Sequence, residues 1–204
     1  MEKHSDCCSH SHGHNGYPWS ALRWSLSLFF ISISFIVMRS FIVNQLVSRA
    51  SSYMACELFN DAIRSYKKAV FIDKRNVTAW DMLGYSYKSN GDLKNAIYAY
   101  HEAIKADPKD KIANFSLGLI LASEKKYEEA VSYLEQIRVL GPDEKGQAID
   151  IVSYHRSSLR LLMTCYEALK EFNKRDSILE ELRRYYPEHN KILDEAKSRR
   201  LLKQ

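Results

Sequence analysis

The chain has 204 residues, a formal net charge of +5 and 27% charged residues. Basic and acidic residues alternate, as in the run 124–129, which indicates solvated helix faces rather than a phosphate-binding stripe. We therefore expect no nucleic-acid partner. The sequence contains no nucleophile elbow, P-loop, dinucleotide fingerprint or HExxH motif, so we expect a protein that is not an enzyme.

Residues 1–18 are predicted to form a disordered tail rich in histidine and cysteine. Imidazole and thiolate groups suit Zn, Ni or Cu. The tail lacks the ligand spacing of a folded zinc site, so two interpretations stay open, a metal site and a merely polar tail. The candidate ligands are His4, Cys7, Cys8, His10, His12 and His14.

Residues 19–43 are predicted to form one transmembrane helix. The stretch from Trp24 to Met38 has no charged residue and would span roughly 22 Å as a helix, less than a hydrocarbon core of about 30 Å. Extension to Ala21–Val43 gives a full span if Arg23 and Arg39 reach the two interfaces. A cleaved signal peptide and a buried first helix of the following domain are the alternatives.

The distribution of basic residues favours one orientation of this helix. Arg39 and Arg49 follow the apolar stretch closely, with Arg64, Lys67 and Lys68 further on. Only Lys3 and Arg23 precede it. By the positive-inside rule, we expect a single-pass membrane protein whose following domain is cytoplasmic rather than periplasmic.

Residues 43–187 show a sequence pattern that recurs at a fixed period. Residues 77–110 read W-x2-L-G-x2-Y, then G-x-L-x2-A, Y-x2-A and D-P, and the offsets recur one period upstream and one downstream. One period is therefore as long as the segment 77–110. A period of this length indicates an array of helix pairs, in which each pair buries its apolar side against its neighbours. Gly84 and Gly118 lie inside predicted helices, where glycine costs about 1 kcal/mol relative to alanine, so we expect close helix approach there.

A fourth repeat is weaker and displaced. An insertion near residues 144–155 breaks the period, and no helix breaker occurs between Gln147 and Leu169, which predicts one long helix. Residues 188–204 are predicted to form a C-terminal helix that caps the array.

This pattern resembles the tetratricopeptide repeat (TPR) family. The resemblance implies an all-α, right-handed superhelix of antiparallel helix pairs, whose first helices line a concave groove that binds a peptide or an amphipathic helix of a partner. Carried over to this sequence, the groove residues are Asp81, Met82, Tyr85, Lys88, Phe115, Leu119, Arg160 and Thr164. Met82 stands where the carboxylate clamp of chaperone-binding relatives needs an asparagine, which argues against that function.

Two functions follow as expectations. The first is a membrane-anchored scaffold that binds a segment of partner proteins and helps to recruit or assemble a complex. The alternative is a metal-handling or metal-responsive membrane protein that uses the tail at residues 1–18. Deletion of the tail distinguishes the two functions, because loss of function with intact partner binding would favour the metal-handling alternative. The sequence does not define the oligomeric state.

Overall fold

The protein is all-α in a computed structural model that describes residues 19–142 and 154–187, with side chains from residue 29 onward. The described residues form eight helices and no strand, which confirms the predicted fold class of helix pairs. The chain divides into two compact units between Ile42 and Val43. The helices are α1 (Trp19–Ala55), α2 (Phe59–Ile72), α3 (Val77–Ser89), α4 (Leu93–Ala106), α5 (Lys111–Ser123), α6 (Tyr127–Leu140), α7 (Tyr154–Ala168) and α8 (Phe172–Tyr185).

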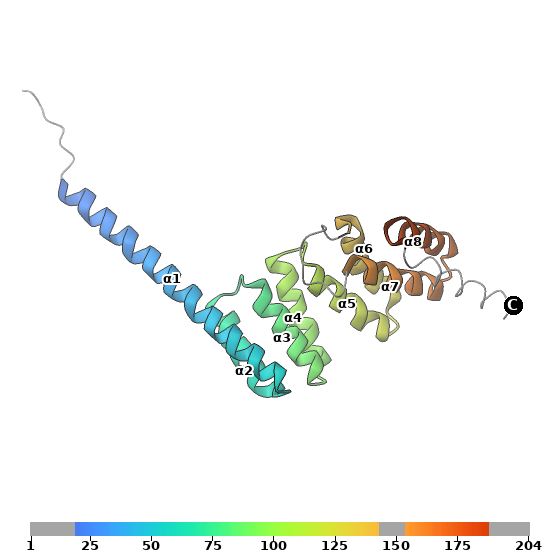
Figure 1. The fold of residues 1–204 in the computed structure, drawn as a ribbon, viewed down its shortest axis with the longest axis horizontal. Helices are drawn as coiled ribbons and strands as arrows, with labels where there is room; N and C mark the ends of the chain where they lie inside the picture. Colours follow the sequence, from blue (N-terminus) through green and yellow to red (C-terminus); the bar gives the residue numbers. More distant parts are fainter. Residues whose placement is uncertain (1–18, 143–153, 188–204) are drawn as a thin grey trace, which may run out of the picture. The chain divides into compact units, whose positions relative to one another are not determined.

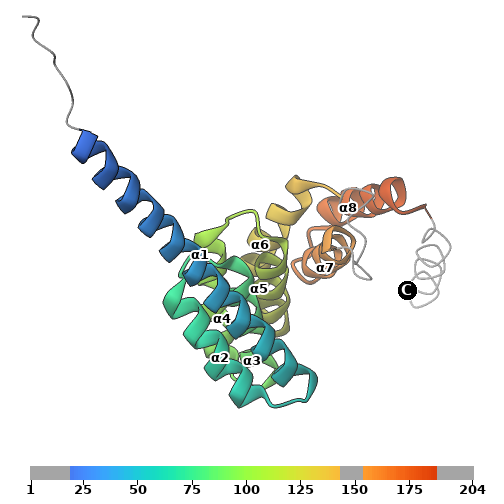
Figure 2. The ribbon, with the colours of Figure 1, turned by 60° about the vertical axis from the view of Figure 1, so that its left-hand side comes forward.

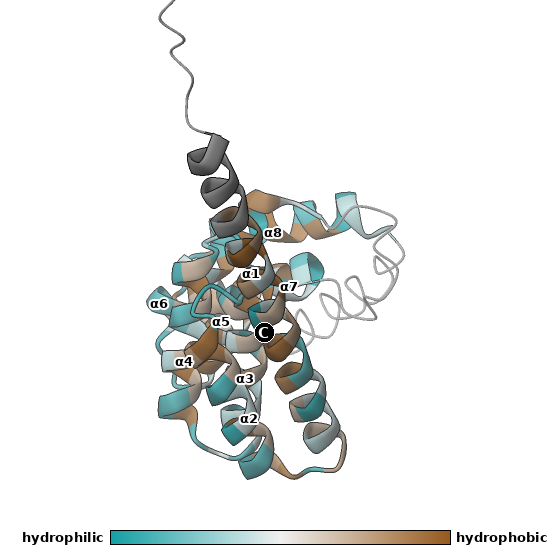
Figure 3. Cartoon of the chain, turned by 90° about the vertical axis from the view of Figure 1, so that its left-hand side faces the viewer, coloured by the Kyte–Doolittle hydropathy of each residue, from teal (hydrophilic) through white to brown (hydrophobic). Residues whose placement is uncertain are grey.

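The described part of the first unit is the stretch of α1 up to Ile42. Its large apolar side chains from Phe29 onward are exposed, and Figure 3 shows this hydrophobic stretch. The Ser32 hydroxyl donates to the Phe29 carbonyl at 2.8 Å, so this polar group is satisfied within the helix. The segment Phe29–Ala55 is long and apolar enough to cross a membrane, a property that signal sequences share.

The second unit is a stack of helix pairs. Residues 43–55 of α1 pair with α2, and the pairs α3–α4, α5–α6 and α7–α8 follow (Figures 1 and 2). Helices α2, α4 and α6 begin at Phe59, Leu93 and Tyr127, and these starting points are equally spaced along the chain. Their spacing equals that of the sequence pattern, so the period in the sequence is the period of the structure.

The turn inside each pair has the same backbone conformation. Glu57, Gly91, Lys125 and Lys170 occupy equivalent positions and all have positive φ, between 58° and 81°. The residue after each of them donates its N–H to the carbonyl five residues earlier, for example Asp92 to Tyr87 at 2.9 Å. This is a Schellman motif, which ends the first helix by satisfying its last carbonyls. The same motif ends α7 at Lys170, before the weakly matching fourth pair.

Small residues on the first helices allow the second helices to approach. A Cβ on Gly84 would lie 2.7 Å from Cε1 of Tyr100, and a Cβ on Gly118 would lie 2.7 Å from Cδ2 of Leu134. Ala50 is the equivalent residue in the first pair and is fully buried. The predicted close contacts at the two glycines are confirmed.

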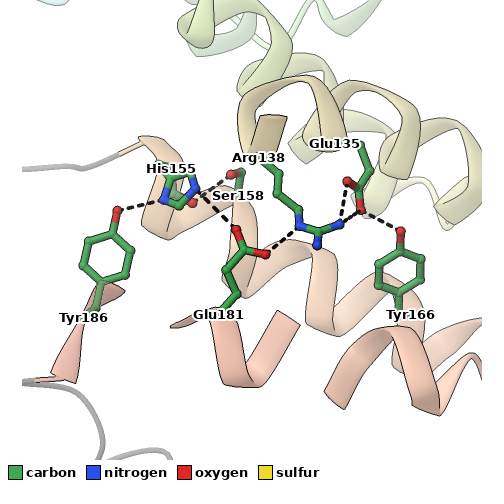
Figure 4. A network of polar contacts seen from close by, with 7 residues as sticks. All are labelled: Glu135, Arg138, His155, Ser158, Tyr166, Glu181 and Tyr186. Atoms are coloured by element: carbon green, nitrogen blue, oxygen red, sulfur yellow. Dashed lines mark hydrogen bonds and ion pairs between the residues drawn. The ribbon is translucent and has the colours of Figure 1, made fainter. Parts of the chain in front are cut away.

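Polar contacts join the fourth pair to the third (Figure 4). Arg138 on α6 donates through Nε to Glu181 on α8 at 2.7 Å and pairs with Glu135 at 3.1 Å. The Tyr166 hydroxyl on α7 donates to the same Glu135 at 2.8 Å. His155 is fully buried, and its Nδ1 lies 2.9 Å from the Tyr186 hydroxyl. These contacts hold α6, α7 and α8 in one arrangement.

Three predicted segments lie wholly or partly outside the described residues. They are the tail at 1–18, the capping helix at 188–204 and the part of the insertion up to residue 153. Helix α7 begins at Tyr154, so the earlier part of the long helix expected from Gln147 also lies outside.

Candidate partner-binding face

The predicted groove residues lie on three first helices of the array. Asp81, Met82, Tyr85 and Lys88 are on α3, Phe115 and Leu119 on α5, and Arg160 and Thr164 on α7. The first helices follow one another through the stack, and α5 also contacts α7 directly. Residues at equivalent positions of successive first helices therefore follow one another along the array.

The most accessible aromatic side chain of the set is Tyr85. It is 47% exposed, and the Lys88 ammonium lies 5.4 Å from the centre of its ring. Burial lowers the pKa of Lys88 from its ordinary value, because desolvation disfavours the charged form. Tyr85 and Lys88 thus form an aromatic surface with a cationic edge.

On α5 the set contributes apolar surface. Leu119 is 39% exposed, and Phe115 is half-buried. The ring of Phe115 packs edge-on against Tyr154 at the start of α7, with 5.7 Å between ring centres. Tyr154 was not among the predicted groove residues, because it lies within the insertion near residues 144–155. We call Tyr85, Lys88, Phe115, Leu119 and Tyr154 the first-helix face.

A buried phenol lies beneath this face. Tyr100 on α4 is buried, and Ser116, Asp81, Tyr154 and Tyr85 are close enough to influence its pKa. Burial raises the pKa of Tyr100 to about 12, so the phenol is neutral at physiological pH. Tyr100, on the second helix α4, thus lies near residues of the three first helices α3, α5 and α7.

Asp81 was predicted to line the groove, but its side chain is only 2% exposed. Its carboxyl faces Asp110, whose own carboxylate begins α5 by accepting the Ala113 N–H at 2.6 Å. Burial, and then the Asp110 charge, raise the pKa of Asp81 to about 8. Within the described part of the chain, Oδ1 of Asp81 has no hydrogen-bond partner. Asp81 is therefore a buried group whose neutral form is favoured, and its carboxyl is not accessible to a partner.

The remaining predicted residues differ in accessibility. Met82 is half-buried and packs against the core of the first three helix pairs. Arg160 and Thr164 are exposed on α7, and the Thr164 hydroxyl donates to the Arg160 carbonyl at 3.2 Å. No described contact connects Arg160 or Thr164 to Tyr85. The structure thus brings Phe115 and Tyr154 together, whereas Arg160 and Thr164 are exposed polar residues of α7.

The candidate metal ligands His4, Cys7, Cys8, His10, His12 and His14 lie outside the described residues. Among the side chains that the structure does describe, no group of three His, Cys, Asp or Glu residues is placed to hold a metal ion. The described cysteines are Cys56, which is exposed in the turn after α1, and Cys165, which is buried. Burial raises the pKa of Cys165 to about 11.

Comparison with known proteins finds a match to the tetratricopeptide repeat family in the middle of the array. The sequence model of that family matches residues 82–145. The chain is 30% identical over 79 residues to Superkiller protein 3 of Schizosaccharomyces pombe, covering 39% of the chain and 6% of that protein. It is 29% identical over 79 residues to Anaphase-promoting complex subunit 3 of the same organism, covering 39% of the chain and 12% of the relative.

A longer match is to an enzyme, the probable UDP-N-acetylglucosamine–peptide N-acetylglucosaminyltransferase SPINDLY of Hordeum vulgare. It is 25% identical over 136 residues, which are 64% of this chain but only 14% of the transferase. The chain therefore spans a small part of each curated relative.

Solved structures share the fold. The MamA protein superimposes with a TM-score of 0.59 at 22% identity, covering 73% of this chain and 75% of MamA. The Sgt2 TPR domain of Aspergillus fumigatus gives 0.51 at 24% identity, covering 65% and 82%. Pseudomonas aeruginosa pilF gives 0.58 at 17% identity, covering 73% and 63%. These likenesses support the predicted superhelix of helix pairs.

Proposed function

Because the chain belongs to the tetratricopeptide repeat family, we propose that it is a membrane-attached scaffold that holds a segment of a partner protein against its first-helix face. One observation carries the proposal. Tyr85 and Leu119 are large apolar side chains, yet they are 47% and 39% exposed on the first helices of adjacent repeats. Exposed aromatic and aliphatic groups in such a row are suited to cover by a partner.

The chemistry of the face defines the partner segment. Tyr85, Phe115 and Tyr154 offer aromatic surface, and Lys88 adds a cation at the edge. An amphipathic helix or an extended apolar segment with acidic flanking residues fits this surface. The burial of Asp81 removes a negative charge from the α3 side, which favours acidic over basic flanks.

The membrane attachment is proposed through α1. The exposed apolar side chains from Phe29 to Ile42 support insertion into a bilayer, because such a surface is unfavourable in water. A cytoplasmic array is proposed because basic residues are more frequent after the apolar stretch than before it. Anaphase-promoting complex subunit 3 belongs by name to a complex, and its likeness to these repeats is consistent with a role in assembly.

Site-specific photo-cross-linking in intact membranes tests this function. A benzophenone amino acid at Tyr85 should capture a partner, whereas the same group at Tyr98 should not. Tyr98 is a matched control, because it is also a tyrosine, is 57% exposed and lies on α4, a second helix. Equal capture at the two positions, or capture at Tyr98 alone, would contradict the assignment of the binding face.

A further inference from the structure

A second surface lies between the C-terminal part of α1 and α2. It is an open hollow of about 630 Å³ lined by Leu46, Arg64, Lys67, Lys68, Phe71 and Ile72. Leu46, Phe71 and Ile72 make its floor apolar, and Phe71 is 82% exposed. A phenyl ring with this exposure contributes nothing to the core, so its burial against another apolar phase is favourable.

The rim of the hollow is cationic. Arg64 pairs with a carboxylate of its own helix at 3.4 Å, but both side chains are exposed and the pair is weak. The Lys67 ammonium lies over the Tyr87 ring at 5.5 Å from its centre, and its charge acts only weakly on the nearby Asp92 carboxylate. Lys68 is exposed and has no ion pair among the described residues. The hollow therefore combines an apolar floor with an excess of positive charge.

The hollow follows the apolar stretch of α1 closely along the sequence. Leu46 is four residues beyond Ile42, so at most about 14 Å of backbone separates them in any conformation. A membrane that contains the residues up to Ile42 therefore has its surface within reach of the hollow. Basic residues beside a membrane span are attracted to anionic phospholipids.

We propose that the hollow between α1 and α2 binds the surface of an anionic membrane, with Phe71 in the acyl–headgroup boundary and Arg64, Lys67 and Lys68 at lipid phosphates. The proposal rests on the membrane attachment proposed above. It goes beyond that attachment, since it assigns a lipid-binding role to the first repeat itself. An acidic amphipathic segment of a protein would meet the same chemistry, but the short chain to the apolar stretch favours lipid.

An environment-sensitive dye tests the proposal on the full-length protein in vesicles. Cys7, Cys8 and the exposed Cys56 are replaced by serine, and Cys165 stays, because it is buried. An NBD dye is attached to Phe71→Cys, or to Val139→Cys as a matched control, since Phe71 and Val139 are both 82% exposed. The vesicles contain phosphatidylcholine alone or with about 30% phosphatidylglycerol.

We expect NBD emission at position 71 to increase by about twofold in the anionic vesicles and to remain unchanged at position 139. The triple variant Arg64→Gln/Lys67→Gln/Lys68→Gln should abolish the increase. A triple variant of exposed lysines elsewhere, Lys94→Gln/Lys109→Gln/Lys170→Gln, should retain it. An equal response at both dye positions, or a response that survives the rim variant, would overturn the proposal. So would a response at position 71 that requires added partner protein.

Extraction of the same vesicles with alkaline carbonate separates the two proposals. Release of the protein would overturn its attachment through α1. If the protein stays in the vesicles after carbonate extraction but NBD emission at position 71 does not increase, only the proposal of lipid binding at the hollow would be overturned.

Discussion

Cε1 of Tyr100 lies only 2.7 Å from the point that a Cβ on Gly84 would occupy. Gly118 and Leu134 show the same relationship in the next repeat. The glycine is thus retained inside a helix because the second helix of its own pair packs onto it, and this contact sets the distance between the two helices.

Substitution of Gly84 by alanine should therefore destabilise the protein. Overpacking costs about 1–3 kcal/mol, and the better helix propensity of alanine returns about 1 kcal/mol, so we expect a net loss of about 1 kcal/mol. Urea unfolding of the full-length protein in detergent, followed by circular dichroism, measures it. With Tyr100→Ala in the background the steric conflict is absent, and the same Gly84→Ala change should stabilise. The same loss in both backgrounds would refute the contact as the cause.

The left-handed residue in the third turn predicts a stabilising substitution. Lys125 has a φ of 64°, where a side chain is unfavourable, and the equivalent residue of the second turn is Gly91. We expect Lys125→Gly to raise the free energy of unfolding by about 0.5 kcal/mol, because relief of the strain exceeds the added chain entropy. Lys68→Gly is the control, since Lys68 is exposed inside helix α2, where glycine should only lose stability. Equal effects of the two changes would contradict the Schellman assignment.

Burial of Asp81 predicts that stability falls as the pH rises. Its pKa is raised to about 8 in the folded state from an ordinary value of 3.8, so the folded protein retains a proton that the unfolded chain loses. The contribution of this group is complete below about pH 4, falls as the pH rises above 4, and is lost once the pH has risen through about 8. Asp81→Asn should flatten this dependence and stabilise the protein at pH 8 by roughly 1–3 kcal/mol, because an amide needs no proton to face Asp110.

Unfolding free energies between pH 5 and pH 9 test this expectation. The control is Asp176→Asn, in which an exposed carboxylate is replaced and the slope should persist. A wild-type protein whose stability is constant or increases over this range, or an Asp81→Asn variant with the wild-type slope, would show that Asp81 is not protonated in the folded protein.

The metal-binding tail stays a proposal that a peptide can test. Titration of residues 1–18 with Zn²⁺ and Ni²⁺ by calorimetry should give a dissociation constant below about 10 µM if the histidines and cysteines bind as a set. The matched peptide with His10, His12 and His14 changed to serine should bind more weakly. A dissociation constant above about 10 µM for the natural peptide would exclude the metal-handling alternative.

The fold was predictable where the repeated residues mark close helix contacts or turn conformations. Gly84, Gly118 and the turn at Gly91 each mark a contact or backbone conformation that recurs from repeat to repeat, so the helix pairs and their register followed from the sequence. The left-handed conformations of Glu57, Lys125 and Lys170 were not predictable from residue type, because no glycine marks them. They become evident only as positions equivalent to Gly91.

The candidate site was less predictable, because it depends on contacts between repeats. Asp81 has the offset of a groove residue, but it is buried and its carboxyl faces Asp110 of the next repeat. Tyr154 contacts Phe115, but it lies in the insertion, where the sequence period does not give its position in the repeat. The ion pair between Arg138 and Glu181 likewise joins residues that are 43 positions apart.

The central claim is that the first-helix face binds a partner, and affinity measurements test it most directly. The partner segment captured at position 85 should be titrated against the full-length protein, its Tyr85→Ala/Phe115→Ala variant and the Tyr98→Ala control. We expect the double variant to bind at least about tenfold more weakly, with an unchanged helical spectrum, and the control to bind within about twofold of wild type. Wild-type affinity in the folded double variant would contradict the assignment of binding to this face.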